Sequence, residues 1–149
     1  MKDFQNDEAA AALLRDVIDE TFDAVIAVLP NSAKIAVSIA KHLGVPILEY
    51  WDDVAFESHL PLSKVVVVDD GVETGTKALK VAGVLGDGII KYLAVPVCSR
   101  EIEATLLSEY RKVYSLKKPF VRRSLDWHYE VRPEYSAAEA RSILKSALH

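Results

Sequence analysis

The sequence predicts an α/β protein, a three-layer α/β/α domain around a mostly parallel, Rossmann-like five-stranded sheet. Short apolar runs alternate along the chain with segments whose apolar residues recur at helical spacing, the pattern of a parallel sheet with covering helices. The 149 residues, half of them apolar and 27% charged, suit one globular domain. Neither a repeat nor a Gly/Ser-rich linker divides them, so we expect a single domain over residues 1–149.

The first half of the chain supplies three predicted strands and two predicted helices. An amphipathic helix is expected over Asp7–Glu20, and the apolar run Ala24–Leu29 predicts a strand buried on both faces. Helical spacing returns over Ser32–Leu43, where the following glycine is a natural stop. Strands are expected over Val45–Tyr50 and over Val65–Val68, the latter because four β-branched residues follow one another.

The second half continues the alternation of helix and strand. A helix is expected over Thr76–Leu85 and a strand over Tyr92–Val97. Ser99 is expected to cap a helix that runs to about Tyr110, and Lys112–Leu116 predicts the fifth strand. Residues 136–139 (SAAE) fit a capping box that opens a final helix to Leu148.

Composition argues against several classes of protein. The formal net charge of -4 and the pI of about 5.6 argue against a broad nucleic-acid surface. The single cysteine, Cys98, excludes an internal disulfide and a zinc cluster of cysteines. The N-terminus is acidic and polar, unlike a signal or transit peptide, and no apolar run is long enough to cross a membrane. We therefore expect a cytoplasmic protein without nucleic-acid or membrane partners.

The segment after the third predicted strand carries the clearest chemical signal. Parallel sheets bind ligands outside the carboxyl ends of their strands, and Asp69 and Asp70 end a strand at that edge. The glycines of the following loop let N–H groups converge at the start of a helix, where an anion is favoured. The acid pair can accept hydrogen bonds from a sugar diol or hold a hydrated Mg²⁺.

These features predict a ribose 5-phosphate site. Asp69 and Asp70 are the expected catalytic pair, and we expect both to be ionised at neutral pH. The expected phosphate loop consists of Gly71, Val72, Glu73, Thr74, Gly75, Thr76 and Lys77.

Other phosphate-binding loops fit less well. A Walker A loop needs one more residue between its glycines than Gly71 and Gly75 have, and it needs a hydroxyl after its lysine, where Lys77 is followed by Ala78. The G-x-G-x-x-G dinucleotide turn is absent. A receiver domain places its acidic pair after the first strand. The simpler alternative is a strand end with two solvated aspartates and a glycine turn.

The segment resembles the type I phosphoribosyltransferases, which carry an apolar strand, two acidic residues and a loop ending on threonine and glycine. Asp69, Asp70, Thr74, Gly75 and Thr76 match this motif. The resemblance implies the fold of that family with a small C-terminal hood. It also implies transfer of the ribose 5-phosphate of phosphoribosyl pyrophosphate to a purine or pyrimidine base, with a nucleoside monophosphate as product.

Further expectations follow from the same resemblance. Mg²⁺ is expected at Asp69 and Asp70, through water or ribose hydroxyls, and a homodimer is the habit of the family. Family members more often have a small residue or threonine at position 73, and an inward glutamate would repel the phosphate, so we expect Glu73 to face solvent. Pro30, Asn31, Ser32 and Ala33 lie where the family has its pyrophosphate loop, but they include neither glycine nor arginine. The alternative for these residues is an ordinary turn in which Asn31 or Ser32 caps the next helix.

Two more segments bear on whether the site turns substrate over. The catalytic lid of the family corresponds here to Trp51–Lys64, which is short and acidic. This favours, as an alternative, a non-catalytic module that senses a nucleotide or phosphoribosyl pyrophosphate. The segment Pro119–Ser136 resembles the region before the last helix in one phosphoribosyltransferase subgroup. By that resemblance the base-binding hood holds Phe120, Val121, Asp126 and Trp127; alternatively, Phe120 and Trp127 pack the last helix onto the sheet.

Overall fold

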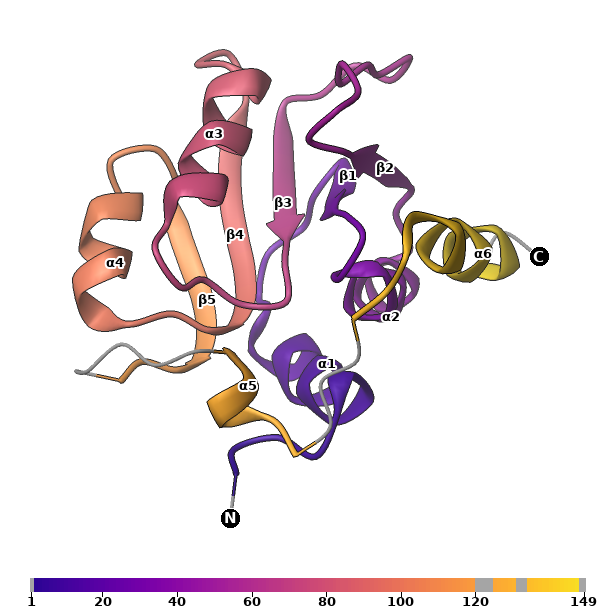
Figure 1. Cartoon of the computed structure of the whole chain (residues 1–149). Coiled ribbons are helices and arrows are strands. Elements are labelled where there is room, and N and C mark those ends of the chain that lie inside the picture. The colour runs from indigo at the N-terminus through magenta and orange to yellow at the C-terminus, as the bar shows by residue number, and fades with distance from the viewer. Residues whose placement is uncertain (1, 120–124, 131–133, 148–149) are drawn as a thin grey trace.

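The computed structural model describes residues 2–119, 125–130 and 134–147. Figure 1 shows a central sheet with helices on both faces. The elements, in chain order, are α1 (Asp7–Val17), β1 (Ala24–Val28), α2 (Ala33–Leu43), β2 (Ile47–Tyr50), β3 (Lys64–Val68), α3 (Thr76–Leu85), β4 (Ile90–Val97), α4 (Arg100–Leu106), β5 (Lys112–Lys117), α5 (Leu125–His128) and α6 (Ala137–Ala147).

The five strands form one parallel sheet in the order β2-β1-β3-β4-β5. The chain therefore leaves β1 toward one edge to make β2 and then crosses back to the other side of β1 to make β3. This reversal places the carboxyl ends of β1 and β3 next to each other. In open α/β sheets such a switch point is where ligands bind.

Alternating side chains of the strands divide the core into two layers. Val66 and Val68 of β3 pack with apolar residues of α1, α2 and α6. Val65 and Val67 face the opposite way and pack with residues of α3 and α4. Because both faces of the central strands are covered, β1 and the Val65–Val68 part of β3 are apolar throughout, as expected for parallel strands. The edge strands β2 and β5 carry polar residues such as Glu49 and Lys112. The predicted three-layer α/β/α architecture is confirmed.

Most predicted elements are found with boundaries shifted by a few residues. α1 ends at Val17 rather than Glu20, because Ile18 is already extended. α4 ends at Leu106, and Tyr110 instead lies buried and donates its hydroxyl hydrogen to the Ala78 carbonyl at 2.8 Å. The short helix α5 has no counterpart in the sequence-based prediction. Four residues are too few for a helical period to be read from the sequence.

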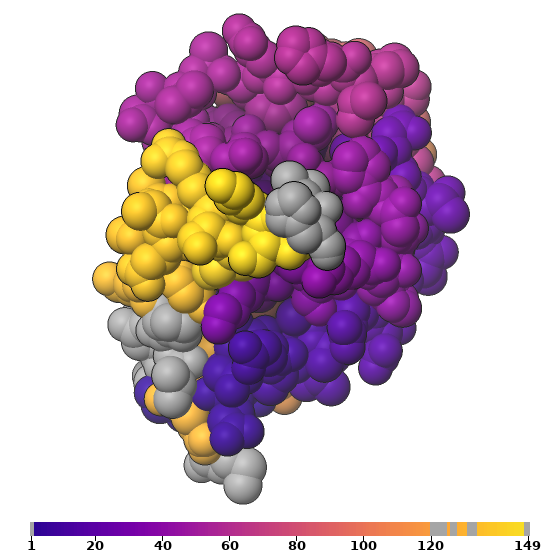
Figure 2. All heavy atoms as spheres, turned by 90° about the vertical axis from the view of Figure 1, so that its right-hand side faces the viewer, coloured from indigo at the N-terminus to yellow at the C-terminus, as the bar shows by residue number. Residues whose placement is uncertain are grey.

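The C-terminal helix α6 lies along α2, on the side of the molecule seen in Figure 2. Its capping box is formed as predicted: Ser136 Oγ accepts from Glu139 N, and Glu139 Oε1 accepts from Ser136 N, both at 3.1 Å. Ala140 and Leu144 bury the inner face of the helix. Among the described residues, no helix is long and apolar enough to span a membrane.

Candidate functional site

A cavity of about 290 Å³ lies at the switch point of the sheet. The loop after β3 supplies most of its wall, the turn after β1 contributes one residue, and α5 closes one side. The lining residues are Asn31, Asp69, Asp70, Gly71, Val72, Glu73, Thr74, Gly75, Lys77, Ala78 and Leu125. The fold thus gathers the predicted acid pair and nearly all of the predicted phosphate loop around one hollow.

The acid pair lies at the floor of this cavity and is largely buried. Asp69 and Asp70 are 9% and 7% exposed, and Asp69 Oδ1 accepts a hydrogen bond from Asp70 N at 2.8 Å. Burial, followed by the charge of Asp70, raises the pKa of the Asp69 carboxyl well above its usual value, while Lys77 opposes the shift. Asp69 is therefore harder to ionise than the sequence alone suggested. The pair is suited to holding donors such as sugar hydroxyls.

The loop after the acid pair is anchored to the neighbouring strand. Val72 N donates to Val97 O at 2.9 Å, and Val72 forms a parallel bridge with Cys98 just beyond β4. This pairing buries the one apolar side chain of the loop and leaves the residues on either side to turn. Gly71 and Gly75 make these turns with φ of 149° and 85°, values that L side chains rarely adopt.

Hydroxyl and cationic groups stand at the start of α3, where the helix dipole favours an anion. Gly75 occupies the N-cap position and Thr76 begins the helix. Thr74 Oγ1 accepts from Thr76 N at 3.4 Å and lies 3.2 Å from Thr76 Oγ1. Lys77 lines the cavity, and its Nζ lies 3.9 Å from Asp52 Oδ2. The arrangement offers hydroxyl donors and one cation at a point where the helix dipole favours an anion.

Glu73 has a structural contact that the sequence did not predict. Its side chain is exposed, as expected, but its Oε1 accepts a hydrogen bond from Leu125 N at 2.9 Å. The carboxylate thus caps the first residue of α5 and attaches the C-terminal segment to the loop. The close packing of Leu125 over Gly71 belongs to the same contact, since a Cβ on Gly71 would clash with the Leu125 side chain.

The turn after β1 reaches the cavity through Asn31 alone among its described residues. Ser32 occupies the N-cap position of α2, but its side chain makes no capping hydrogen bond. Asn31 Oδ1 instead accepts from Tyr135 N at 3.0 Å. The capping alternative is therefore not observed, and Asn31 links the cavity to the segment before α6. No sequence signal connected Tyr135 to this turn, because the two residues are 104 positions apart.

The predicted hood is described only in part. Phe120 and Val121 lie outside the described residues. Asp126 and Trp127 belong to the backbone of α5, and their side chains lie outside the description. Among the described residues of this segment, it is Leu125, which the sequence reasoning did not single out, that lines the cavity.

Comparison with known proteins relates the chain to solved structures. No protein-family model matches the sequence, and no curated protein matches it. The protein TT1426 of Thermus thermophilus is 20% identical and has a TM-score of 0.81, with 98% of this chain and 99% of that chain covered. Orotate phosphoribosyltransferase of Aeropyrum pernix is 27% identical, with a TM-score of 0.63 and coverage of 74% and 69%.

A third structure has a ligand bound. It is the orotate phosphoribosyltransferase of Mycobacterium tuberculosis in complex with phosphoribosyl pyrophosphate, 19% identical, with a TM-score of 0.59 and coverage of 75% and 72%. The strand order, the cavity at the switch point and these likenesses agree with the motif after β3. The chain has the type I phosphoribosyltransferase fold.

Proposed function

We propose that this protein is a phosphoribosyltransferase, which transfers the ribose 5-phosphate of phosphoribosyl pyrophosphate to a nitrogen base and releases pyrophosphate. The observation that carries the proposal is the cavity in which a buried acid pair faces a glycine-threonine loop at a helix N-terminus. An acceptor pair beside an anion cradle matches the two ends of a ribose 5-phosphate. The complex of the Mycobacterium tuberculosis enzyme with phosphoribosyl pyrophosphate supports the same choice of substrate.

The residues of the chain act by holding the reacting groups. Asp69 and Asp70 accept hydrogen bonds from the two ribose hydroxyls, and the N–H groups around Gly75 hold the 5-phosphate. The base nitrogen then forms its bond to the anomeric carbon while the bond to pyrophosphate breaks. Pyrophosphate leaves with that electron pair, and the N–H proton of the base passes to water. Rate enhancement comes from positioning and from fixed donors around the developing charge.

The acid pair also suits a magnesium ion. Mg²⁺ is usually held by one or two carboxylates together with substrate phosphates and water. Within the described ranges, no three His, Cys, Asp or Glu side chains converge on one point. Asp69 and Asp70 would therefore supply the protein's share, directly or through water and the ribose hydroxyls. The ion would neutralise charge on the departing pyrophosphate.

A screen for pyrophosphate release tests the proposal. Wild-type protein is incubated with magnesium phosphoribosyl pyrophosphate and, in turn, adenine, guanine, hypoxanthine, xanthine, uracil and orotate. We expect base-dependent release from at least one of them, and none from the matched variant in which Asp69 and Asp70 are both replaced by Asn. Release that survives in this variant contradicts the assigned site.

One observation favours a second function, a non-catalytic sensor of phosphoribosyl pyrophosphate or a nucleotide. Between β2 and β3 the chain has neither helix nor strand, and its Asp52 engages Lys77 and Lys80 at 3.9 Å each. A short acidic connection is a poor lid, and an open site admits water to the reacting carbon. A sensor is stabilised by magnesium phosphoribosyl pyrophosphate in a thermal shift assay and releases no pyrophosphate with any base. At about 100 times the dissociation constant, the ligand adds roughly 2.7 kcal/mol to the free energy of unfolding.

A further inference from the structure

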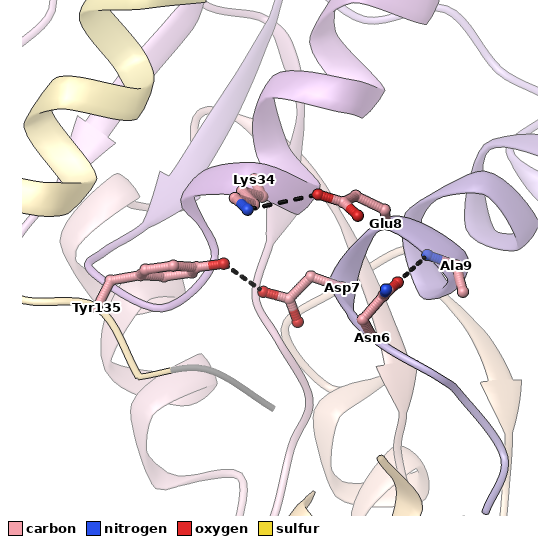
Figure 3. Close-up of polar contacts among 6 residues, drawn as sticks. All are labelled: Asn6, Asp7, Glu8, Ala9, Lys34 and Tyr135. Carbon is pink, nitrogen blue, oxygen red and sulfur yellow. Dashed lines mark hydrogen bonds and ion pairs between the residues drawn. The ribbon is translucent and has the colours of Figure 1, made fainter. Parts of the chain in front are cut away.

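Tyr135 joins three distant segments at the edge of the ligand cavity. Its hydroxyl donates to Asp7 Oδ2 at 3.1 Å, a contact seen in Figure 3. Its backbone N–H donates to Asn31 Oδ1 at 3.0 Å, and Asn31 lines the cavity. A helix at the start of the chain, the turn after β1 and the segment before α6 therefore meet at one residue.

Asp7, which accepts the hydrogen bond from the Tyr135 hydroxyl, is fixed in place by its burial at the start of a capped helix. Asp7 is the first residue of α1, is 3% exposed, and follows Asn6, whose side chain caps the helix by accepting from Ala9 N at 2.9 Å. Burial and the nearby Asp7 charge raise the pKa of the Tyr135 hydroxyl. The hydroxyl therefore stays protonated as a donor, and Asp7 fixes where the tyrosine lies.

The contact with the Tyr135 backbone determines which way the Asn31 carboxamide faces. A backbone N–H can only donate, so the atom of Asn31 that meets it must be the carbonyl oxygen. The nitrogen of the same planar group diverges from that oxygen and is turned away from Tyr135. Asn31 lines the cavity, and the N–H donors on this nitrogen are the groups through which it could bind an acceptor in a ligand.

We propose that Tyr135 is a positioning residue that aims the Asn31 amide nitrogen at the pyrophosphate portion of phosphoribosyl pyrophosphate. The inference rests on the proposed function and deepens it. The turn at residues 30–33 contains no glycine that would let backbone N–H groups approach an anion. The Asn31 side chain, held by Tyr135 and through it by Asp7, supplies the N–H donor in place of a backbone N–H. Asn31 touches substrate; Tyr135 and Asp7 act through it.

Asn31→Asp tests the donor directly. The variant keeps the oxygen that accepts from Tyr135 N and replaces the N–H donors with an oxygen. Losing a hydrogen bond to a charged group should weaken binding of magnesium phosphoribosyl pyrophosphate by about 10- to 100-fold in isothermal titration calorimetry. Ribose 5-phosphate lacks the pyrophosphate and should bind as it does to wild type, which separates a lost contact from general charge repulsion.

Tyr135→Phe tests the positioning. The ring and the backbone N–H remain while the tie to Asp7 is lost, so affinity for phosphoribosyl pyrophosphate should fall by about 3- to 10-fold. Asp7→Asn keeps an acceptor for the hydroxyl and should retain most of the affinity, whereas Asp7→Ala should match Tyr135→Phe. The matched control is Tyr114→Phe, which removes a 2.8 Å bond to Asp19 and should leave both ligands unaffected.

The combined variants decide whether Tyr135 acts through Asn31. Adding Tyr135→Phe to Asn31→Asp should cause no further loss of phosphoribosyl pyrophosphate affinity, since the donor being aimed is already gone. Additive losses, or equal losses for ribose 5-phosphate, overturn this inference and leave the proposed function standing. Wild-type protein that binds neither ligand overturns the proposed function and this inference with it.

Discussion

The proposed phosphate loop depends on the conformation of Gly75, and replacing this glycine by alanine makes a quantitative test. Gly75 has φ of 85°, and an added Cβ would lie 3.0 Å from Ile102 Cγ2. Left-handed backbone costs a non-glycine residue about 1–2 kcal/mol, and the lower entropy of the unfolded chain returns about 0.4–1 kcal/mol of this. With the tight contact to Ile102 added, Gly75→Ala should lower the free energy of unfolding by about 1 kcal/mol. For a domain of this size, that is a Tm lower by about 2–4 °C.

Two other glycines serve as controls that separate the cost of backbone strain from the cost of the contact with Ile102. Gly44 has a similar left-handed conformation, φ 69°, with nothing within 4 Å of an added Cβ, so Gly44→Ala measures the backbone strain without the contact. Gly83 lies inside α3 with open space around it and no positive φ. There alanine is the better helix former, and Gly83→Ala should raise stability by about 0.5–1 kcal/mol.

The assay is urea unfolding of the three variants beside wild type, followed by ribose 5-phosphate titration. Gly75→Ala should also weaken binding of the phosphate, because the N-terminal amides of α3 must shift to relieve the strain. Gly44→Ala and Gly83→Ala lie away from the cavity and should bind normally. A Gly75→Ala protein as stable as Gly83→Ala refutes the conformational reasoning. Unchanged affinity refutes the placement of the phosphate at this loop.

Three further predictions concern the acid pair and the last helix. Replacing both Asp69 and Asp70 by Asn should abolish phosphoribosyl binding in calorimetry while circular dichroism stays that of wild type; retained affinity contradicts the ribose assignment. Burial raises the pKa of the Asp69 carboxyl in the folded protein, so as pH rises the unfolded chain loses the carboxyl proton before the folded protein does. The free energy of unfolding therefore falls from about pH 4 upward until the folded-state pKa is passed. Asp69→Asn should remove that fall, and its stability advantage in urea melts should grow with pH; a constant difference argues against the shift. Ser136→Ala should cost about 0.5–2 kcal/mol by opening the capping box, and an unchanged Tm would show that the box contributes nothing.

Short-range patterns in the sequence were sufficient to predict the three layers of the fold and the loop between β3 and α3. The run Val65–Val68 could only be a strand covered on both faces, and the acids that follow it had to stand at its carboxyl end. Glycines and threonines then marked the turn into α3, which begins and ends where predicted. These features could be read because each depends on residues that are neighbours along the chain.

The contacts made by the C-terminal segment could not be predicted in this way. Glu73 was expected only to face solvent, yet its carboxylate holds the start of α5 at Leu125. The sequence left open whether Asn31 caps a helix, yet its side-chain oxygen accepts a hydrogen bond from Tyr135 N. In both cases the partner lies more than fifty positions away, and polar side chains in loops carry no periodic signal that would reveal such a partner.

The sequence by itself determined the strands of the sheet, the acid pair at its edge and the glycine-threonine loop that follows, because hydrophobic periodicity and turn chemistry act over short distances. Tertiary structure alone decided that the turn after β1 adjoins that loop, since strand order sets the switch point. It also decided that Asp69 is buried beside Asp70, which changes its acidity. Burial and contacts between segments distant in sequence arise only in the folded chain. They bring Asn31 and Leu125 next to the loop after β3, and together these residues form the wall of the cavity.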